Sequence, residues 1–179
     1  AIESLIGFLS FAIAAGLLYG RFSRPRSFVR FSEKMLLTNY QGGKALMFRL
    51  VGYKDDHILT NVEIKVSARL FSPEGNYQFY NLDLERSHVD SLVLNWTIVH
   101  PINEKSPFWG LSQEDIQNLQ PEVSALLIGF DEVYSSTVMA RNSYALNDLF
   151  FGYRFAPMYF RGKSNTKLDL SLLDAVEEV

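Results

Sequence analysis

Residues 61–70 read NVEIKVSARL, and their pattern decides the fold class. Apolar residues occupy every second position, with charged or polar residues between them. Successive side chains of a strand point to opposite faces of a sheet, so this alternation is typical of an antiparallel strand with one buried face. A helix would need apolar residues three and four positions apart. The stretch therefore predicts a half-buried β-strand.

Further apolar and β-rich segments surround this strand: 35–40, 45–51, 77–84, 92–99, 123–130, 136–144 and 150–155. Turn residues such as Pro101 and Gly129 bound them. Residues 41–44, QGGK, predict a hairpin turn. A short helix is indicated where Ser112 can cap and Asp115 can close the first turn. Seven or eight short strands without long helices between them predict a mainly β chain that folds as a β-sandwich.

Composition limits the classes of protein that this chain can represent. Its 179 residues suffice for one domain and a short appendage, and 47% are hydrophobic, so the chain should fold. Cysteine is absent, which excludes disulfides, thiolate metal sites and cysteine nucleophiles. A net charge of −3 argues against a nucleic-acid partner, although the charge is unevenly distributed along the chain.

An uncharged apolar stretch at residues 4–20 is followed by a basic segment, RFSRPRSFVRFSEK, at 21–34. As a helix the stretch would be about 25 Å long, slightly less than the ~30 Å hydrocarbon core of a bilayer. The basic segment contains five Arg or Lys residues and one Glu, whereas residues 35–179 contain 12 basic and 18 acidic residues, a balance of −6. An acidic body is thus joined to an apolar helix by a basic segment.

Three interpretations of the apolar stretch compete. A signal peptide would carry its positive charges before the apolar residues, which is the reverse of the order here. A buried core helix is compatible with the length. A membrane helix is favoured, because the Arg cluster fits the positive-inside pattern and Ala12, Gly16 and Gly20 allow close helix packing. The chain starts at Ala1 inside this pattern, so we expect it to be the tail of a longer protein.

No sequence pattern for catalysis or metal binding is found. His57, His88 and His100 lie far apart in sequence without HExxH spacing, so a metal site has no support. Neither a GxSxG motif nor a phosphate-binding glycine loop occurs. Adjacent carboxylates such as Asp131 and Glu132 would point to opposite faces of a strand. We therefore expect neither an enzyme nor a bound metal or cofactor.

Five segments together resemble one known family. They are RFSRP at 21–25, LMFRL at 46–50, VHPINEKSPFWGLS at 99–112, ARNSY at 140–144 and FGYRF at 151–155. Inward-rectifier potassium channels carry the similar motifs ARFSRP, LMFRV, HxIDExSPL, ARxSY and WGHRF in the same order. Each motif alone is weak evidence for the family, but five motifs in the same order are strong evidence. The similarity covers essentially the whole chain. The chain resembles the C-terminal half of such a channel, of the prokaryotic kind.

The resemblance implies a domain organisation and an assembly. Residues 1–22 would be the cytoplasmic part of the pore-lining inner transmembrane helix, 23–30 a basic linker at the membrane interface, and 31–179 an immunoglobulin-like cytoplasmic β-sandwich. Four identical copies would form a homotetramer in the cell membrane that conducts potassium ions passively. The TVGYG-type filter of the family precedes the inner helix and is absent from this sequence, so this chain alone would not select potassium.

The resemblance also implies gate residues on the apolar helix. Tyr19 matches the bulky residue at the bundle crossing, where four aromatic rings can close a pore by steric block and dewetting. Gly7 and Gly16 match inner-helix glycines. Phe11 falls where strong rectifiers carry an acid, so block by spermine should be weak. The alternatives are an interfacial Tyr and glycines that serve helix packing alone.

Two further sets of residues are implied by the family match. Anionic lipid head groups would bind Arg21, Arg24, Arg26 and Lys54. Paired hydrogen bonds to phosphate suit guanidinium groups, although the same arginines could merely set membrane topology. A loop that narrows the cytoplasmic pore would contain Gly129, Phe130, Asp131 and Glu132, with Gly129 supplying a permissive backbone. An ordinary hairpin loop is the alternative there.

A function of another class also fits the sequence. A single-span membrane-anchored β-sandwich that binds a protein partner would show the same apolar helix, basic segment and strands. The two functions differ in stoichiometry, because a channel subunit should assemble with fourfold symmetry around a hydrophilic tunnel lined by acids.

Overall fold

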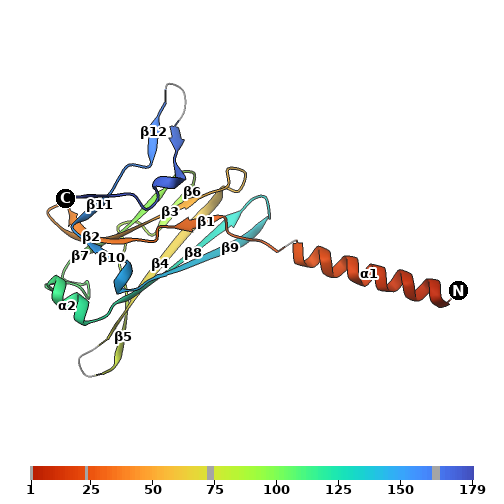
Figure 1. Cartoon of the computed structure of the whole chain (residues 1–179), viewed down its shortest axis with the longest axis horizontal. Coiled ribbons are helices and arrows are strands. Elements are labelled where there is room, and N and C mark those ends of the chain that lie inside the picture. The colour runs from red at the N-terminus through yellow and green to blue at the C-terminus, as the bar shows by residue number, and fades with distance from the viewer. Residues whose placement is uncertain (1, 23, 72–74, 163–165) are drawn as a thin grey trace.

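The computed structural model describes residues 2–22, 24–71, 75–162 and 166–179, which form one projecting helix and a β-rich body (Figure 1). Helix α1 spans Ile2–Phe22. Its segment Ile2–Arg21 has a mean hydropathy of 1.8, and none of its most apolar window is buried. A core helix would be covered by the body, so the structure contradicts that alternative.

The body contains two five-stranded sheets. The first sheet has the order β1 (Val29–Phe31), β3 (Gly43–Gly52), β2 (Met35–Tyr40) and β10 (Leu149–Phe151), with β7 (Trp96–Ile102) also paired to β3. The second sheet has the order β5 (Tyr77–Asn81), β4 (Leu59–Phe71), β8 (Glu122–Asp131) and β9 (Ser136–Tyr144), with β6 (His88–Leu92) also paired to β4. Only the β10–β2 pairing is parallel among the described ladders.

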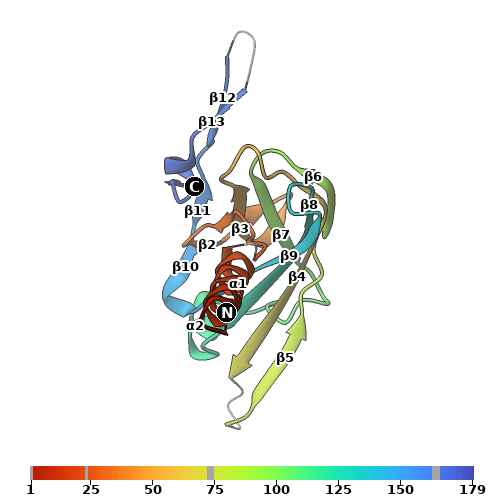
Figure 2. The ribbon, with the colours of Figure 1, turned by 90° about the vertical axis from the view of Figure 1, so that its right-hand side faces the viewer.

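Smaller elements complete the body. They are the helix α2 (Gln113–Asn118), the 3₁₀ turns η1 (Leu146–Asp148) and η2 (Leu170–Leu172), the paired strands β11 (Tyr153–Phe155) and β14 (Val176–Glu178), and the hairpin strands β12 (Tyr159–Arg161) and β13 (Thr166–Leu168). Figure 2 shows the β12–β13 hairpin projecting from the body.

The core lies between the two sheets, and strand β4 illustrates how the sequence builds it. Its alternate residues Val62, Ile64, Val66, Ala68 and Leu70 are all buried. They belong to one cluster with inward-facing residues of the other sheet, which include Leu46, Phe48, Leu50 and Ile98. The predicted alternation and the mainly β sandwich fold are confirmed.

Two local predictions are also confirmed. The β2–β3 turn has positive φ at Gln41 (47°) and Gly42 (82°), the conformation that a two-residue hairpin with matching strand twist requires. Helix α2 begins with a capping box, in which Ser112 Oγ accepts from Asp115 N at 3.1 Å and Asp115 Oδ2 accepts from Ser112 N at 2.9 Å.

Three predicted strands are wrong in extent. Segment 77–84 forms strand β5 only as far as Asn81, and Leu82 enters the core outside a strand. Segment 92–99 is divided between β6 and β7, because the chain leaves the second sheet and enters the first there. Val93 is 65% exposed and Leu94 41% exposed, so these apolar residues belong to the crossing and not to the core. Segment 150–155 is divided between β10 and β11 at Gly152, whose φ of +76° lies in the left-handed region that glycine tolerates.

Pro101 and Gly129 were expected at strand boundaries, and both lie within strands. Pro101 pairs with Ala45 in β7, for which the structure describes pairing with β3 alone, and an edge position tolerates a missing N–H. Gly129 pairs with Val138 in β8. A Cβ at Gly129 would lie 3.3 Å from side-chain atoms of Leu59 and Val62, so the glycine permits close packing rather than an unusual backbone.

Replacing Gly129 should therefore destabilise the core. Gly129→Ala should lower the free energy of unfolding by about 1–3 kcal/mol, because the added methyl overpacks a closed interior. Gly43→Ala is the matched control, since its Cβ would meet its nearest neighbour at 3.8 Å, an ordinary contact. Denaturant titration of the chain in detergent measures both variants. Equal stabilities for the two would contradict the packing role of Gly129.

Candidate functional site

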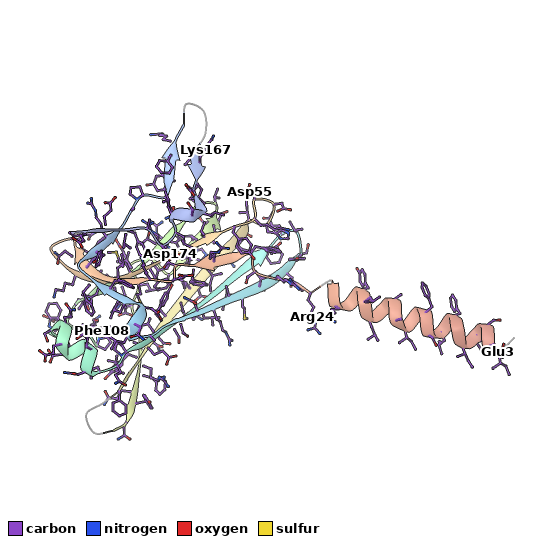
Figure 3. The ribbon with its side chains drawn as sticks, in the orientation of Figure 1. Glu3, Arg24, Asp55, Phe108, Lys167 and Asp174 are labelled. Carbon is purple, nitrogen blue, oxygen red and sulfur yellow. The ribbon has the colours of Figure 1, made fainter. Side chains whose placement is uncertain are left out.

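Strand register brings three chain segments together at one end of the body. Leu59 at the start of β4 pairs with Asp131 at the end of β8, so the β3–β4 loop lies beside the β8–β9 turn. Val29 of β1 pairs with Gly52 at the end of β3, and Tyr53 N donates to Phe28 O at 2.9 Å. This end faces α1, as Arg24 at the junction and Asp55 in the β3–β4 loop indicate (Figure 3).

A buried hydrogen bond joins two of these segments. His57 Nδ1 lies 2.7 Å from Asp131 Oδ2, and the exposed fractions of the residues are 7% and 0%. Asp131 Oδ1 also accepts from the backbone N–H groups of Val133 at 2.9 Å and Tyr134 at 3.0 Å. One carboxylate thus fixes the β8–β9 turn and attaches it to the β3–β4 loop.

The charge of Asp131 is maintained by these bonds. Burial alone would raise the pKa of its carboxyl group by disfavouring the ionised form. The hydrogen bonds from His57, Tyr134 and Val133, together with the charge interaction with His57, outweigh burial and hold the pKa below its usual value. Asp131 therefore remains an anion at neutral pH and stabilises the observed conformation of the β8–β9 turn.

Phe28 connects the third segment to this pair. Its ring centroid lies 4.4 Å from that of His57, 5.8 Å from that of Tyr53 and 6.3 Å from that of Tyr134. Lys54 Nζ lies 4.6 Å from the centre of the same ring, within the range of a cation–π contact. We call Phe28, Tyr53, Lys54, His57, Asp131 and Tyr134 the helix-facing cluster.

The residues expected to bind lipid all lie near this end and are exposed. Arg21 is in the last turn of α1, and Arg24 and Arg26 are in the segment between α1 and β1. Lys54 lies in the β3–β4 loop and belongs to the helix-facing cluster. The structure thus brings the fourth cation to the same end as the three arginines, although it comes from a distant part of the sequence.

The expected gate residues are spread around α1. Tyr19 is 75% exposed and Phe11 72% exposed, so nothing in the described chain covers either ring. Gly7 and Gly16 are nine residues apart, which is 2.5 helical turns, and therefore lie on opposite sides of the helix. Each has open space around the position of an added Cβ. Contacts of these residues would have to come from outside this chain.

The expected pore-loop residues occupy different environments. Gly129, Phe130 and Asp131 end strand β8, and Glu132 lies in the turn. Phe130 is 39% exposed and Glu132 is exposed, whereas Asp131 points inward to His57. Within this chain only Phe130 and Glu132 of the four present side chains to the outside.

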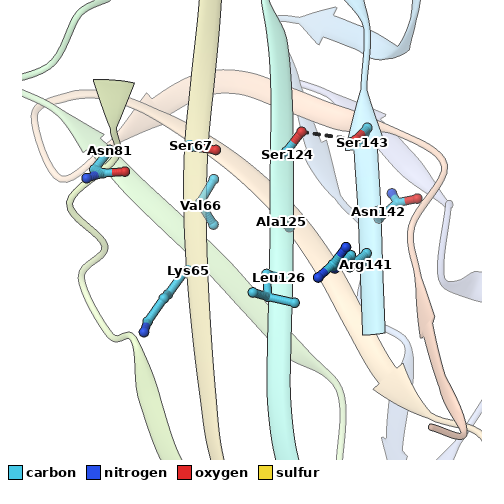
Figure 4. Close-up of a pocket in the computed structure, with 10 residues that line it drawn as sticks. All are labelled: Lys65, Val66, Ser67, Asn81, Ser124, Ala125, Leu126, Arg141, Asn142 and Ser143. Carbon is cyan, nitrogen blue, oxygen red and sulfur yellow. Dashed lines mark hydrogen bonds between the residues drawn. The ribbon is translucent and has the colours of Figure 1, made fainter. Parts of the chain in front are cut away.

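A shallow hollow of about 370 Å³ lies on the outer face of strands β4, β8 and β9 (Figure 4). Ser124 and Ser143 hydroxyls lie 3.1 Å apart in it, with Lys65 and Arg141 nearby. Its lining contains no carboxylate. Arg141 and Ser143 belong to the ARNSY motif at 140–144. Tyr144 of that motif is buried in the core, where desolvation raises its pKa to about 12.

A second hollow, of about 780 Å³, lies at the end of the body away from α1, near Phe108 (Figure 3). Apolar residues such as Trp109, Ile116 and Phe151 line it. None of the residues that the sequence suggested for a gate, lipid contact or pore loop reaches it. In the described part of the chain, no group of three His, Asp or Glu side chains could hold a metal ion.

Comparison with known proteins identifies the family. Residues 29–179 match the family model described as the inward rectifier potassium channel C-terminal domain. The chain belongs to the inward rectifier potassium channel family. Members of this family are ion channels and not enzymes, so the expectation of a protein without catalytic activity is confirmed.

Several inward rectifiers are similar over most of this chain. Kirbac3.1 of Paramagnetospirillum magnetotacticum is 33% identical over 161 residues, covering 88% of this chain and 55% of the relative. ATP-sensitive inward rectifier potassium channel 12 of Gallus gallus is 28% identical, covering 99% and 44%. Human inward rectifier potassium channel 4 is 29% identical, covering 99% and 42%. The chain thus spans about half the length of these inward rectifiers.

Among solved structures, the sporulation control protein Spo0M of Bacillus subtilis aligns with a TM-score of 0.34 and 10% identity, covering 74% of this chain and 58% of that chain. This likeness is too slight to bear on fold or function.

The five inward-rectifier motifs in the sequence did not predict most residues of the helix-facing cluster. Phe28, Tyr53 and Tyr134 were not among the expected site residues, and His57 was considered only as a metal ligand that the sequence does not support. The available signal was the concentration of aromatic residues next to charged loops. It could not indicate which aromatic residues meet, because that depends on strand register.

Breaking the His57–Asp131 pair should destabilise this inward-rectifier domain. Asp131→Asn should lower the free energy of unfolding by about 1.5–3 kcal/mol, since a charge-assisted hydrogen bond between buried groups is lost. The lowered pKa of Asp131 means that its contribution is complete above about pH 4, the ordinary Asp value, and is lost as pH falls through the lower folded-state pKa.

Denaturant titrations from pH 7 to pH 2 measure this difference between wild type and Asp131→Asn. The exposed Asp55→Asn is the control and should change stability by less than about 0.5 kcal/mol. A difference that is undiminished at pH 2 would contradict the role of the ionised carboxylate.

Proposed function

We propose that this chain is the inner-helix end and cytoplasmic domain of a homotetrameric channel that passes potassium ions passively across the cell membrane. The proposal rests on the order of three features along the chain. An apolar helix that the body does not cover is followed at once by a basic segment and then by an inward-rectifier domain that begins at residue 29. The β-sandwich would lie on the cytoplasmic side, because the arginines follow the helix immediately.

The proposed gate requires contacts between copies of α1. Large apolar side chains cover the helix on all sides and have no partner within the described chain. In a bilayer, lipid and other helices would surround them, and four Tyr19 rings would narrow the pore. The residues fit this role because Tyr19 lies three positions before the end of α1 and only two before Arg21.

The helix-facing cluster would connect lipid binding to the cytoplasmic pore. Anionic head groups would contact Arg21, Arg24 and Arg26 on the linker side and Lys54 on the loop side. Lys54 is the residue that lies over Phe28, so a head group that attracts Lys54 would draw it away from that ring. Because Phe28 packs on His57, and His57 holds Asp131, a change at the linker would reach the β8–β9 turn through direct contacts.

A second function, a membrane-anchored module that binds a protein partner, would use the same helix. The match over residues 29–179 to a channel domain favours the channel. The two proposals separate on stoichiometry and on ion flux.

The channel is tested with the longest natural form of the protein that contains this chain, purified and reconstituted in liposomes. We expect a fourfold assembly by native mass spectrometry and an uptake of rubidium, a potassium substitute, that barium blocks. Tyr19→Ala should increase basal uptake at least severalfold, because it widens the proposed constriction. A monomer without uptake would instead favour the partner-binding module.

Neutralising the arginine in the last turn of α1 and the two in the following linker, which we call the linker variant, should weaken lipid binding. Each basic residue near an anionic surface contributes about 1 kcal/mol, so Arg21→Gln, Arg24→Gln and Arg26→Gln together should reduce affinity for phosphatidylserine vesicles about 100-fold. Sedimentation with vesicles and flux at increasing anionic lipid content measure this effect.

The matched control replaces three exposed cations of the body, Arg86, Lys105 and Arg161, by Gln. It should leave both readouts close to wild type. If the linker variant retains full lipid dependence, the arginines serve membrane topology alone.

A further inference from the structure

The hollow of about 780 Å³ near Phe108 opens from one end of the core between the two sheets (Figure 3). Four residues that line it also belong to the core cluster, and each of them is 8% exposed or less: Leu37, Ile102, Phe108 and Ile116. They form an apolar floor. Trp109 lines the same hollow but is 55% exposed, so we call this site the Trp109 hollow.

A buried histidine fixes the turn that carries Phe108 and Trp109. His100 Nδ1 lies 2.6 Å from Asp83 O, and a carbonyl only accepts, so Nδ1 holds a proton. Burial lowers the pKa of His100, so the ring is neutral at neutral pH and its Nε2 accepts from Ser106 Oγ at 2.8 Å. Ser106 Oγ in turn accepts from Phe108 N at 3.2 Å. The wall of the hollow is therefore in place without a ligand, which lowers the cost of binding one.

The polar groups of the Trp109 hollow suit an anion. Lys44 is the only charged side chain among the described residues that line it, and no lining side chain is a carboxylate. Lys44 is exposed, and none of the ion pairs formed among the described residues includes it. The amides of Asn39 and Gln113 supply further hydrogen-bond donors.

The size of the hollow favours a small molecule over a protein partner. Small-molecule sites have volumes of about 300–1,000 Å³ and mostly apolar linings with a few polar groups, and this hollow has both properties. A stable protein interface buries about 800 Å² on each partner around an apolar centre. Only Trp109 and Val179 among the lining residues expose large apolar side chains, which is too few for such a centre.

We propose that the Trp109 hollow binds a small aromatic acid, with its ring against Trp109 and Phe151 and its carboxylate paired with Lys44. Aromatic rings gain from stacked or edge-to-face contacts beyond the area they bury, and three lining side chains are aromatic. A carboxylate forms a charge-assisted hydrogen bond with an ammonium group. This ligand site is independent of the proposed channel, because none of the residues assigned to gate, lipid contact or pore loop lines it.

Fluorine NMR locates the bound ligand, with 2-naphthoate as the probe. The whole chain, α1 included, is labelled with 5-fluorotryptophan and held in lipid nanodiscs. Its two tryptophans, Trp96 and Trp109, give two signals, which Trp96→Phe assigns. The probe should move the Trp109 signal to saturation and leave that of Trp96 unchanged, since Trp96 does not line the hollow. A Trp109 signal that stays in place, or that moves only together with that of Trp96, overturns the inference.

Equilibrium dialysis tests the chemistry of the ligand by comparing 2-naphthoate with the uncharged 2-naphthamide, after subtraction of binding to empty nanodiscs. The acid should bind at least fivefold more tightly than the amide. Lys44→Gln should abolish this preference, and Trp109→Ala should weaken the binding of both probes at least tenfold. The matched controls, Lys65→Gln and Phe79→Ala, replace exposed side chains outside the hollow and should behave as wild type. Equal affinities of wild type for the two probes overturn the pairing with Lys44.

Acrylamide quenching shows whether protein covers the hollow instead. In Trp96→Phe without any probe, the fluorescence of Trp109 should be quenched strongly, as expected for an indole that is open to solvent. A Trp109 that is shielded from acrylamide would mean that a neighbouring copy or another protein segment occupies the hollow, and would overturn the inference.

Discussion

The pairing of β4 with β8 is the constraint on which the rest of the body depends. Strand β4 contributes a buried side chain to the core at every second position from Val62 to Leu70 and pairs with three other strands, β5, β6 and β8. Because one face must be buried, a register shift of one residue would expose the whole apolar set. A β-bulge between Thr60 and Glu63 shifts the pairing by one residue, and the shifted register places Leu59 beside Asp131. The core therefore fixes the position of the loops that form the helix-facing cluster, and the buried His57–Asp131 pair then joins them.

The side chains of the body and of the helix differ in whether they find partners within the chain. Inside the sandwich, the polar groups of the helix-facing cluster form hydrogen bonds and aromatic contacts within the chain. Along α1, apolar side chains remain exposed and contact nothing in the body. Arg49 shows a third condition, a buried charge that the described residues leave unpaired. The groups that find partners within the chain stabilise its fold, whereas the large apolar side chains of α1 stay exposed and two nitrogens of Arg49 lack a hydrogen-bond partner among the described residues.

The sequence allowed prediction of features whose causes are local. Alternation at residues 61–70, the turn at 41–44 and the capping box at Ser112 each depend on neighbours within a few positions, and the structure confirms all three. The prediction of one strand each for segments 92–99 and 150–155 was wrong, because composition alone does not indicate where a chain changes sheets. The helix-facing cluster could not be predicted, since His57 and Asp131 are 74 residues apart and meet only through strand register. The lipid, gate and pore-loop residues remain predictions.

The short connection between α1 and the body has a mechanical consequence. Six peptide units separate Phe22, the last residue of α1, from Phe28, and a fully extended chain of that length reaches about 21 Å. Phe28 is held at the far end by three rings and by the hydrogen bond from Tyr53. The connection is thus a tether with a fixed maximum length. Once the connection is fully extended, any further movement of the helix end away from the body must either move the whole sandwich or break the contacts of Phe28 with the three rings.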